Sequence, residues 1–168
     1  LLPFIDKAFN IDDPLFLWTA RQILQTPTDP YAFTVNWYGL DAPIAQVTKN
    51  APLASYYIAL VAIALGWSER VLHLAFLLPA LAAVVGTYLV ARDLCGHPMV
   101  ASACGVFTPV FFVSSLTIMC DMLMLAFWVF AVYLWVRGLR TNNHALLALA
   151  GLLVALSALS KYFGITLI

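Results

Sequence analysis

The sequence predicts an all-α fold: a polytopic transmembrane helical bundle whose first loop is extracytoplasmic and carries surface helices. Hydrophobic residues make up 64% of the 168 residues, charged residues only 10%, and the mean hydropathy is +0.95. A soluble domain has roughly a quarter of its residues charged. The eight acidic and eight basic residues cancel. This balance provides no field that would attract nucleic acid, so we expect no nucleic-acid partner.

The chain opens and closes on apolar residues, so we interpret it as a fragment of a longer protein, with residues 1–5 as the stub of a preceding span. It shows no signal peptide, because the required apolar region and cleavage site are missing. Cys95, Cys104 and Cys120 have no CxxC spacing and lie in or beside apolar runs. We therefore expect them to be buried thiols.

Residues 6–67 are predicted to form the outer loop with interfacial helices. Asp13-Pro14 is typical of a helix start, with Asp13 as the N-cap and Pro14 in the first turn. The helix is expected to end near Gln25 and to lie on the membrane surface. Prolines between residues 26 and 52 break further helices, while aromatic residues there favour a structured cap at the interface. Residues 53–67 are apolar but number only fifteen. A span needs roughly twenty, so this segment is predicted to be interfacial or re-entrant.

Four transmembrane helices are expected after this loop, at residues 71–91, 99–116, 122–136 and 145–160. The apolar stretch 98–136 is about twice the length of one span, so it must turn back, and polar residues place the turn at 114–121. Successive spans alternate in direction, which groups Arg92 with Arg137 and Arg140. The positive-inside rule assigns this group to the cytoplasm and Asp121 and Lys161 to the outer side.

The adjacent carboxylates Asp12 and Asp13 lie on the same side of the membrane as Asp121 and Lys161 only if residues 53–67 do not cross it. Capping of the helix explains Asp13 without any further role. Asp12 is a candidate general base toward an acceptor hydroxyl, or a ligand of a divalent cation. Asp121 is a second candidate, because an ionisable group within a span costs roughly 2.5 to 3.5 kcal/mol at mid-bilayer and is functional by default. The alternative for Asp121 is a polar helix end at the water interface.

The basic candidates are Lys161, Lys49 and Arg21. Lys161 follows the last apolar run, so it is either an anchor whose charged end reaches the interface or a point charge that binds a lipid phosphate. Lys49 and Arg21 could likewise bind a lipid phosphate, or they could simply be solvated. The three histidines, His73, His97 and His144, are isolated and lack metal-ligand spacing. HExxH, P-loop, GxGxxG, four-cysteine zinc and GxSxG patterns are missing, so zincin, nucleotide-binding, zinc-finger and serine-hydrolase classes have no support.

Four stretches together resemble the N-terminal half of the membrane module of GT-C glycosyltransferases, specifically the protein O-mannosyltransferases and the lipid A aminoarabinose transferase. These stretches are Asp12-Asp13 before Ala20-Arg21, Asn50-Ala51-Pro52-Leu53 with Tyr56-Tyr57, Gly66 to Leu74, and Asp121 followed by Leu159-Ser160-Lys161-Tyr162. The likeness covers nearly the whole chain. Each motif is weak alone, whereas their order and spacing are fairly specific.

The resemblance implies an enzyme that takes a sugar from a polyprenyl-phosphate carrier and passes it to an acceptor on the outer, periplasmic face of a bacterial inner (plasma) membrane. It implies Asp12 as catalytic base, Asp13 as its acidic neighbour, Lys161 and Lys49 as phosphate-binding residues, and Asp121 as a residue that orients the sugar or a cation. The partners implied are the lipid-linked donor and membrane lipid. The sequence identifies no cofactor; a divalent cation held by Asp12 and Asp121 is the one candidate.

Two alternatives remain open from the sequence. In a transporter or flippase, Asp121 and Lys161 would line a pathway, a class that predicts inverted repeats, and the chain has no internal repeat. The other alternative is a catalytically inactive relative. Asn50 stands where the resembled family has a basic residue or histidine, Ala51 replaces its first proline, and His73 stands where an arginine is usual.

Overall fold

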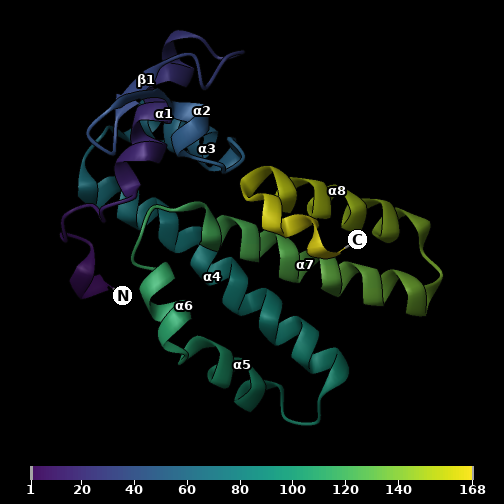
Figure 1. The fold of residues 1–168 in the computed structure, drawn as a ribbon. Coiled ribbons are helices and arrows are strands. Elements are labelled where there is room, and N and C mark those ends of the chain that lie inside the picture. Colours follow the sequence, from purple (N-terminus) through teal and green to yellow (C-terminus); the bar gives the residue numbers. More distant parts are fainter. Residues whose placement is uncertain (1, 168) are drawn as a thin grey trace.

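The computed structural model describes residues 2–167 of the chain, with side chains from residue 3 to residue 166. The predicted stub at 1–5 begins outside this range, and its described part is a short 3-10 helix. The elements in chain order are η1 (Leu2–Phe4), α1 (Asp13–Gln25), β1 (Thr34–Asn36), β2 (Asp41–Pro43), α2 (Ile44–Val47), α3 (Leu53–Leu65), α4 (Glu69–Leu94), α5 (Pro98–Val106), α6 (Pro109–Ser114), α7 (Cys120–Thr141), α8 (His144–Ser160) and η2 (Tyr162–Leu167) (Figure 1).

The bundle is built around α4 and α7, two helices that are long and apolar enough to cross a membrane. Glycines allow close packing at two of its contacts. A Cβ on Gly86 would lie 2.5 Å from a side-chain carbon of Val129 on α7, and one on Gly138 would lie 2.7 Å from a side-chain carbon of Leu147 on α8. The all-α prediction is confirmed, with one small exception: β1 and β2 form an antiparallel hairpin in which Val35 pairs with Ala42.

The prediction of one continuous helix at residues 99–116 is wrong. The span expected at 99–116 consists of two short helices, α5 and α6, separated at Phe107 and Thr108. Pro109 has no amide hydrogen to donate to a continuing helix, and its ring would clash with the carbonyl four residues earlier. Thr108 instead caps the new helix, its Oγ1 accepting a hydrogen bond from the backbone N–H of Phe111 at 3.3 Å. The turn expected at 114–121 does separate α6 from α7.

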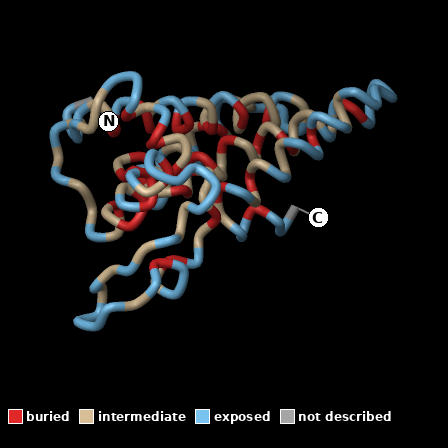
Figure 2. The backbone as a smooth tube through the Cα atoms, turned by 90° about the horizontal axis from the view of Figure 1, so that it is seen from above, coloured by how far each residue is buried: buried red, intermediate tan, exposed pale blue. Residues whose placement is uncertain are grey.

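Helices α1, α2 and α3 cover one end of the bundle, beside the first turns of α4 and α7 (Figure 1). One buried hydrophobic cluster joins α1, α3, α4 and the start of α7. Its members are Phe16, Ala20 and Ile23 of α1, Ala54, Ile58 and Ala59 of α3, Leu72 and Phe76 of α4, and Ile118, Cys120 and Leu123 at the start of α7. Figure 2 shows buried residues gathered where the helices meet, whereas loops and helix tips are exposed. The first loop is therefore a structured cap fixed to the bundle.

The cysteines divide into two groups. Cys120 is buried in the cluster just described, as expected, whereas Cys95 and Cys104 are exposed at or near the far end of the bundle. The expectation of buried thiols is therefore wrong for Cys95 and Cys104. Apolar runs in a membrane protein need not face protein, because the hydrocarbon region of the bilayer also removes them from water.

Candidate active site

Asp121 and Lys161 form an ion pair at the capped end of the bundle. Nζ of Lys161 donates a hydrogen bond to Oδ1 of Asp121 at 2.7 Å, and the two side chains are 34% and 29% exposed respectively. Asp121 lies in the first turn of α7 and Lys161 directly follows α8, so each charge opposes the partial charge of its own helix end. Burial lowers the pKa of Lys161, but the hydrogen bond and negative charge of Asp121 outweigh burial and raise this pKa overall. The pair is charged and reachable from solvent.

Asp12 and Asp13 lie at the start of α1 in different surroundings. Asp13 is fully buried, and its Oδ2 accepts a hydrogen bond from the backbone N–H of Asn10 at 2.7 Å. The prediction that Asp13 is the N-cap is wrong, because α1 begins at Asp13 and this carboxylate binds backward to Asn10 rather than forward to the helix amides. Asp12 occupies the N-cap position, yet its side chain makes no capping bond.

The two carboxylates therefore have separate tasks. Burial raises the pKa of Asp13, and hydrogen bonds from the backbone amides of Asn10 and Ile118 oppose this shift. Asp13 ties the start of α1 to the chain before it. Asp12 is half-buried, and among the described residues no hydrogen bond or ion pair engages its carboxylate. Of the two carboxylates, only that of Asp12 is accessible from solvent.

Tyr31 links two parts of the first loop. Its hydroxyl donates a hydrogen bond to the backbone oxygen of Asn50 at 2.7 Å. Burial raises the pKa of Tyr31, and so do neighbouring groups that include Tyr162, the residue after Lys161, and Cys120, the residue before Asp121. The hydrogen bond to Asn50 fixes the segment that carries Lys49, and Tyr31 itself lies near the residues that flank the ion pair. In the sequence, Tyr31 is only one of several aromatic residues in a loop, which does not distinguish it as a residue near the site.

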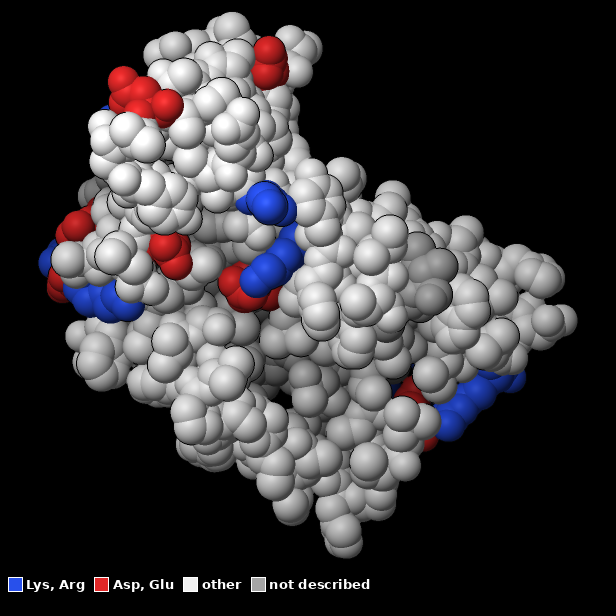
Figure 3. Space-filling view, in the orientation of Figure 1, with Lys and Arg blue, Asp and Glu red and all other residues white. Residues whose placement is uncertain are grey.

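Charged side chains of both signs gather around a hollow between the cap and the bundle (Figure 3). The capped end holds Asp12 and Asp13 at the start of α1 and the pair Asp121–Lys161, because Phe16 of α1 shares a cluster with Ile118 and Cys120 at the start of α7. Lys49 is exposed, on the loop that Tyr31 fixes here. Five of the six candidate residues thus belong to one end of the molecule.

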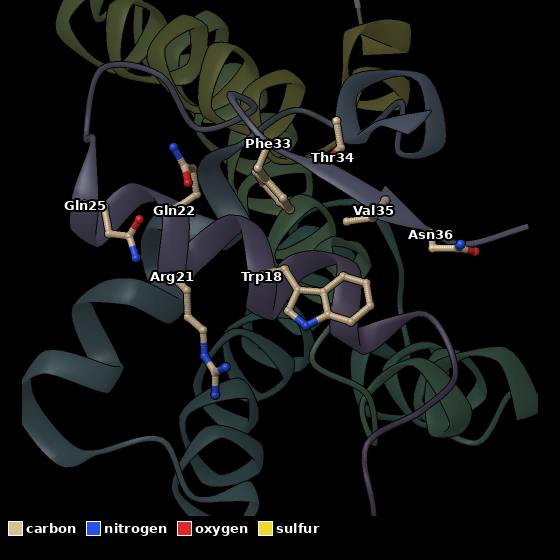
Figure 4. Close-up of a pocket in the computed structure, with 8 residues that line it drawn as sticks. All are labelled: Trp18, Arg21, Gln22, Gln25, Phe33, Thr34, Val35 and Asn36. Carbon is tan, nitrogen blue, oxygen red and sulfur yellow. The ribbon is translucent and has the colours of Figure 1, made fainter. Parts of the chain in front are cut away.

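Arg21 is placed differently. Its guanidinium lies over the ring of Trp67, 5.3 Å from the ring centroid, and makes no ion pair among the described residues. Arg21 borders an open groove of about 390 Å³ between α1 and the strand β1. In Figure 4 the guanidinium points away from β1, whereas Trp18 and Phe33 lie between the two elements. The structure therefore does not bring Arg21 to the Asp121–Lys161 pair.

The opposite end of the bundle holds the arginine group expected from span parity. Nε of Arg137 and of Arg92 each lie 3.9 Å from the carboxylate of Asp93. Nη2 of Arg140 donates a hydrogen bond to the backbone oxygen of Asp93 at 3.0 Å. The arginines at the ends of α4 and α7 thus lie together, and the charged pair Asp121–Lys161 lies at the other end.

No group of three or more His, Cys, Asp or Glu side chains in the described part of the chain is placed to hold a metal ion. His97 and His144 are exposed at the starts of α5 and α8, whereas His73 is buried beneath the cap.

Fold and site together define a helical membrane protein with a charged, solvent-reachable site at one end of its bundle. Residues 49–168 match the family model described as dolichyl-phosphate-mannose-protein mannosyltransferase, and the chain belongs to this family. The expected likeness to GT-C mannosyltransferases is confirmed, and the chain is a member of a family of integral membrane glycosyltransferases that use lipid-linked sugars. No curated protein and no solved structure matches the chain. The matched range includes Lys49, Asp121 and Lys161 and leaves out Asp12, Asp13 and Arg21.

Proposed function

We propose that this protein transfers a sugar from a polyprenyl-phosphate carrier to an acceptor hydroxyl on the outer, periplasmic face of a bacterial inner membrane, by direct displacement with Asp12 as base. The observation that carries this proposal is the shared location of a free carboxylate, Asp12, and the Asp121–Lys161 pair at one end of the bundle. Membership of the mannosyltransferase family supports the reaction class.

In the proposed step, the acceptor oxygen attacks the anomeric carbon of the donor sugar and forms the new glycosidic bond. The acceptor proton passes to the carboxylate of Asp12. The bond between the anomeric carbon and the phosphate oxygen breaks, and its electron pair leaves with the polyprenyl phosphate. Negative charge grows on that phosphate, so a cation beside it lowers the barrier.

Lys161 is suited to receive this phosphate. An ammonium group has three N–H donors, and Asp121 engages one of them at 2.7 Å. No other acceptor among the described residues engages this ammonium, which leaves donors for the phosphate while Asp121 fixes the direction of the side chain. Lys49, exposed on the loop held by Tyr31, is the second cation in our proposal. Arg21 has a peripheral role at most, since it stacks on Trp67.

A divalent cation could bind at this end of the molecule only if the substrate supplied some of its ligands. Asp12 and Asp121 are the carboxylates available at this end, and the described residues supply no third ligand beside them. Donor phosphate oxygens would complete the coordination, since hard divalent cations prefer oxygen ligands and bind through one or two carboxylates plus phosphates.

The test is a transfer assay with the full-length protein in proteoliposomes and a polyprenyl-phosphate sugar donor. Asp12→Asn keeps the shape of the side chain and removes the base, so transfer should fall by about 10²- to 10⁴-fold. Asp29→Asn, at an exposed loop position, is the matched control and should retain full activity. Transfer unaffected by Asp12→Asn would overturn the assignment of the base. Movement of the intact lipid-linked sugar across the membrane without transfer would instead identify a flippase.

A further inference from the structure

The three arginines at the end of the bundle away from the cap have hydrogen-bond donors to spare. Nε of Arg92 and Nε of Arg137 each lie 3.9 Å from the carboxylate of Asp93, which is too far for a hydrogen bond. Arg140 uses one donor, from Nη2, on the backbone oxygen of Asp93. A guanidinium has five N–H donors, so most of the donors of this arginine group engage no described residue. Three arginines and one aspartate leave two positive charges at this end (Figure 3).

An apolar groove of about 220 Å³ lies between α4 and α7 near the same end. Its lining includes Val90, Ala91 and Leu94 of α4 and Trp128 and Val132 of α7, and the surface inside it is almost entirely apolar. The one hydroxyl in the lining, Oγ1 of Thr87, donates a hydrogen bond to the backbone oxygen of Ala83 at 2.7 Å. Apolar cavities hold no ordered water and accept apolar guests, so this groove suits a hydrocarbon chain.

The groove and the arginine group meet at the end of α4. Leu94 lines the groove, and Asp93, the residue before it, accepts the hydrogen bond from Arg140. Both helices are long and apolar enough to cross a membrane, so the groove extends from the headgroup level into the hydrocarbon region. Trp135 on α7 is 51% exposed, which fits this depth because tryptophan concentrates at the membrane–water interface.

We propose that the arginine group and this groove together bind one anionic phospholipid, with its phosphate on the guanidinium groups and part of one acyl chain in the groove. A guanidinium matches a phosphate through two parallel N–H donors. A zwitterionic lipid carries a cation beside its phosphate, so the net positive charge of the site favours an anionic lipid over it. A free phosphate would leave the groove unfilled. The proposal does not depend on the function proposed above, because the site lies at the opposite end of the bundle from Asp121 and Lys161.

The first test measures lipid affinity of the full-length protein in detergent. Native mass spectrometry with added phosphatidylglycerol or phosphatidylcholine gives the two dissociation constants. An arginine near an anionic lipid is worth about fivefold in binding, so the preference for phosphatidylglycerol should fall about 25-fold in Arg137→Gln/Arg140→Gln. Lys7→Gln/Arg70→Gln removes two exposed charges at the capped end and should keep the preference. Equal binding of the two lipids by the unaltered protein, or a preference unchanged in the arginine variant, would overturn the proposal.

The second test asks whether an acyl chain occupies the groove. Bromine atoms on a lipid chain quench tryptophan fluorescence on contact, and Trp128 lines the groove. In phosphatidylcholine nanodiscs, a small fraction of brominated phosphatidylglycerol should quench the full-length protein more than the same fraction of brominated phosphatidylcholine. Trp128→Phe should remove this difference, whereas Trp18→Phe, in the cap, should leave it. Equal quenching by the two lipids, a difference that survives Trp128→Phe, or displacement of the lipid by inorganic phosphate alone would overturn the placement of the chain.

Discussion

Nζ of Lys161 and Oδ1 of Asp121 are 2.7 Å apart although 40 residues separate them in the chain. Lys161 directly follows α8 and Asp121 lies in the first turn of α7, so the antiparallel packing of these two helices brings the charges together. The pair lies under the cap that carries Asp12, and its exposure leaves one side of the ammonium open. This arrangement fixes the ammonium group of Lys161 at the capped end of the bundle, where we propose that it binds the donor phosphate.

Replacing Lys161 should weaken use of the lipid-linked donor. Lys161→Met keeps most of the side-chain length and removes the charge, so kcat/KM should fall by about 10²-fold, as for the loss of one stabilising donor. Lys161→Arg should retain part of the activity, because it keeps the charge but not the compact ammonium. Thermal stability should change by about 1 kcal/mol or less, since the pair is partly exposed. Lys7→Met is the control, and an unchanged kcat/KM in Lys161→Met would exclude the phosphate role.

Gly164→Ala should displace the turn that holds Lys161. A Cβ at this position would lie 2.5 Å from the backbone carbon and from Oγ of Ser157, so the turn η2 must move. Overpacking of this kind costs about 1–3 kcal/mol, measurable as a lower unfolding temperature. We expect the KM for the donor to rise with it, because the backbone N–H of Gly164 bonds the carbonyl oxygen of Lys161 at 2.8 Å.

Gly151→Ala provides the matched control for that experiment. Beyond the chain neighbours and the backbone of α8 itself, no described atom lies within 4 Å of a Cβ at Gly151, so the methyl group fits without movement. Alanine is favoured over glycine inside a helix by about 0.5–1 kcal/mol, so this variant should be as stable as the parent or slightly more stable. Equal effects of the two substitutions would show that the contact with Ser157 does not matter.

Cysteine labelling should place the capped end outside the cell. In a background with Cys95, Cys104 and Cys120 replaced, an impermeant reagent should modify Asp41→Cys and Lys49→Cys in intact cells. His97→Cys and Thr141→Cys should react only after permeabilisation, because they lie at the arginine-rich end, which the positive-inside rule assigns to the cytoplasm. All four positions are exposed, so access alone does not explain a difference. Labelling of the two groups from the same side would refute this topology.

Helix α3 should remain in one leaflet. Its 13 residues extend about 20 Å, short of the roughly 30 Å of a bilayer core. Leu60 and Ile63 are 67% and 69% exposed and face away from α1. Spin labels at these positions should report shallow depths, in contrast to Leu81 near the middle of α4. Depths that pass through the bilayer centre from the start to the end of α3 would show that it crosses.

The sequence alone determined the helical class and most of the element pattern. Apolar length separated α4, α7 and α8 from the loops, and polar residues located the turn before α7. Alternation of spans grouped Arg92 with Arg137 and Arg140, which the structure brings together around Asp93. These properties are local or depend only on counting helices. Apolar length alone predicts one continuous helix at 99–116, whereas Pro109 interrupts it after Thr108.

Only the tertiary structure decided which polar groups meet. It paired Lys161 with Asp121, turned Asp13 away from its own helix and toward Asn10, placed Arg21 on Trp67, and buried His73 beside the start of α1. Hydropathy is summed over neighbouring residues and survives any arrangement of the helices, whereas a hydrogen bond requires two atoms from distant segments to meet within about 3 Å. That distance depends on how the cap packs against the bundle, and no single segment of the chain encodes it.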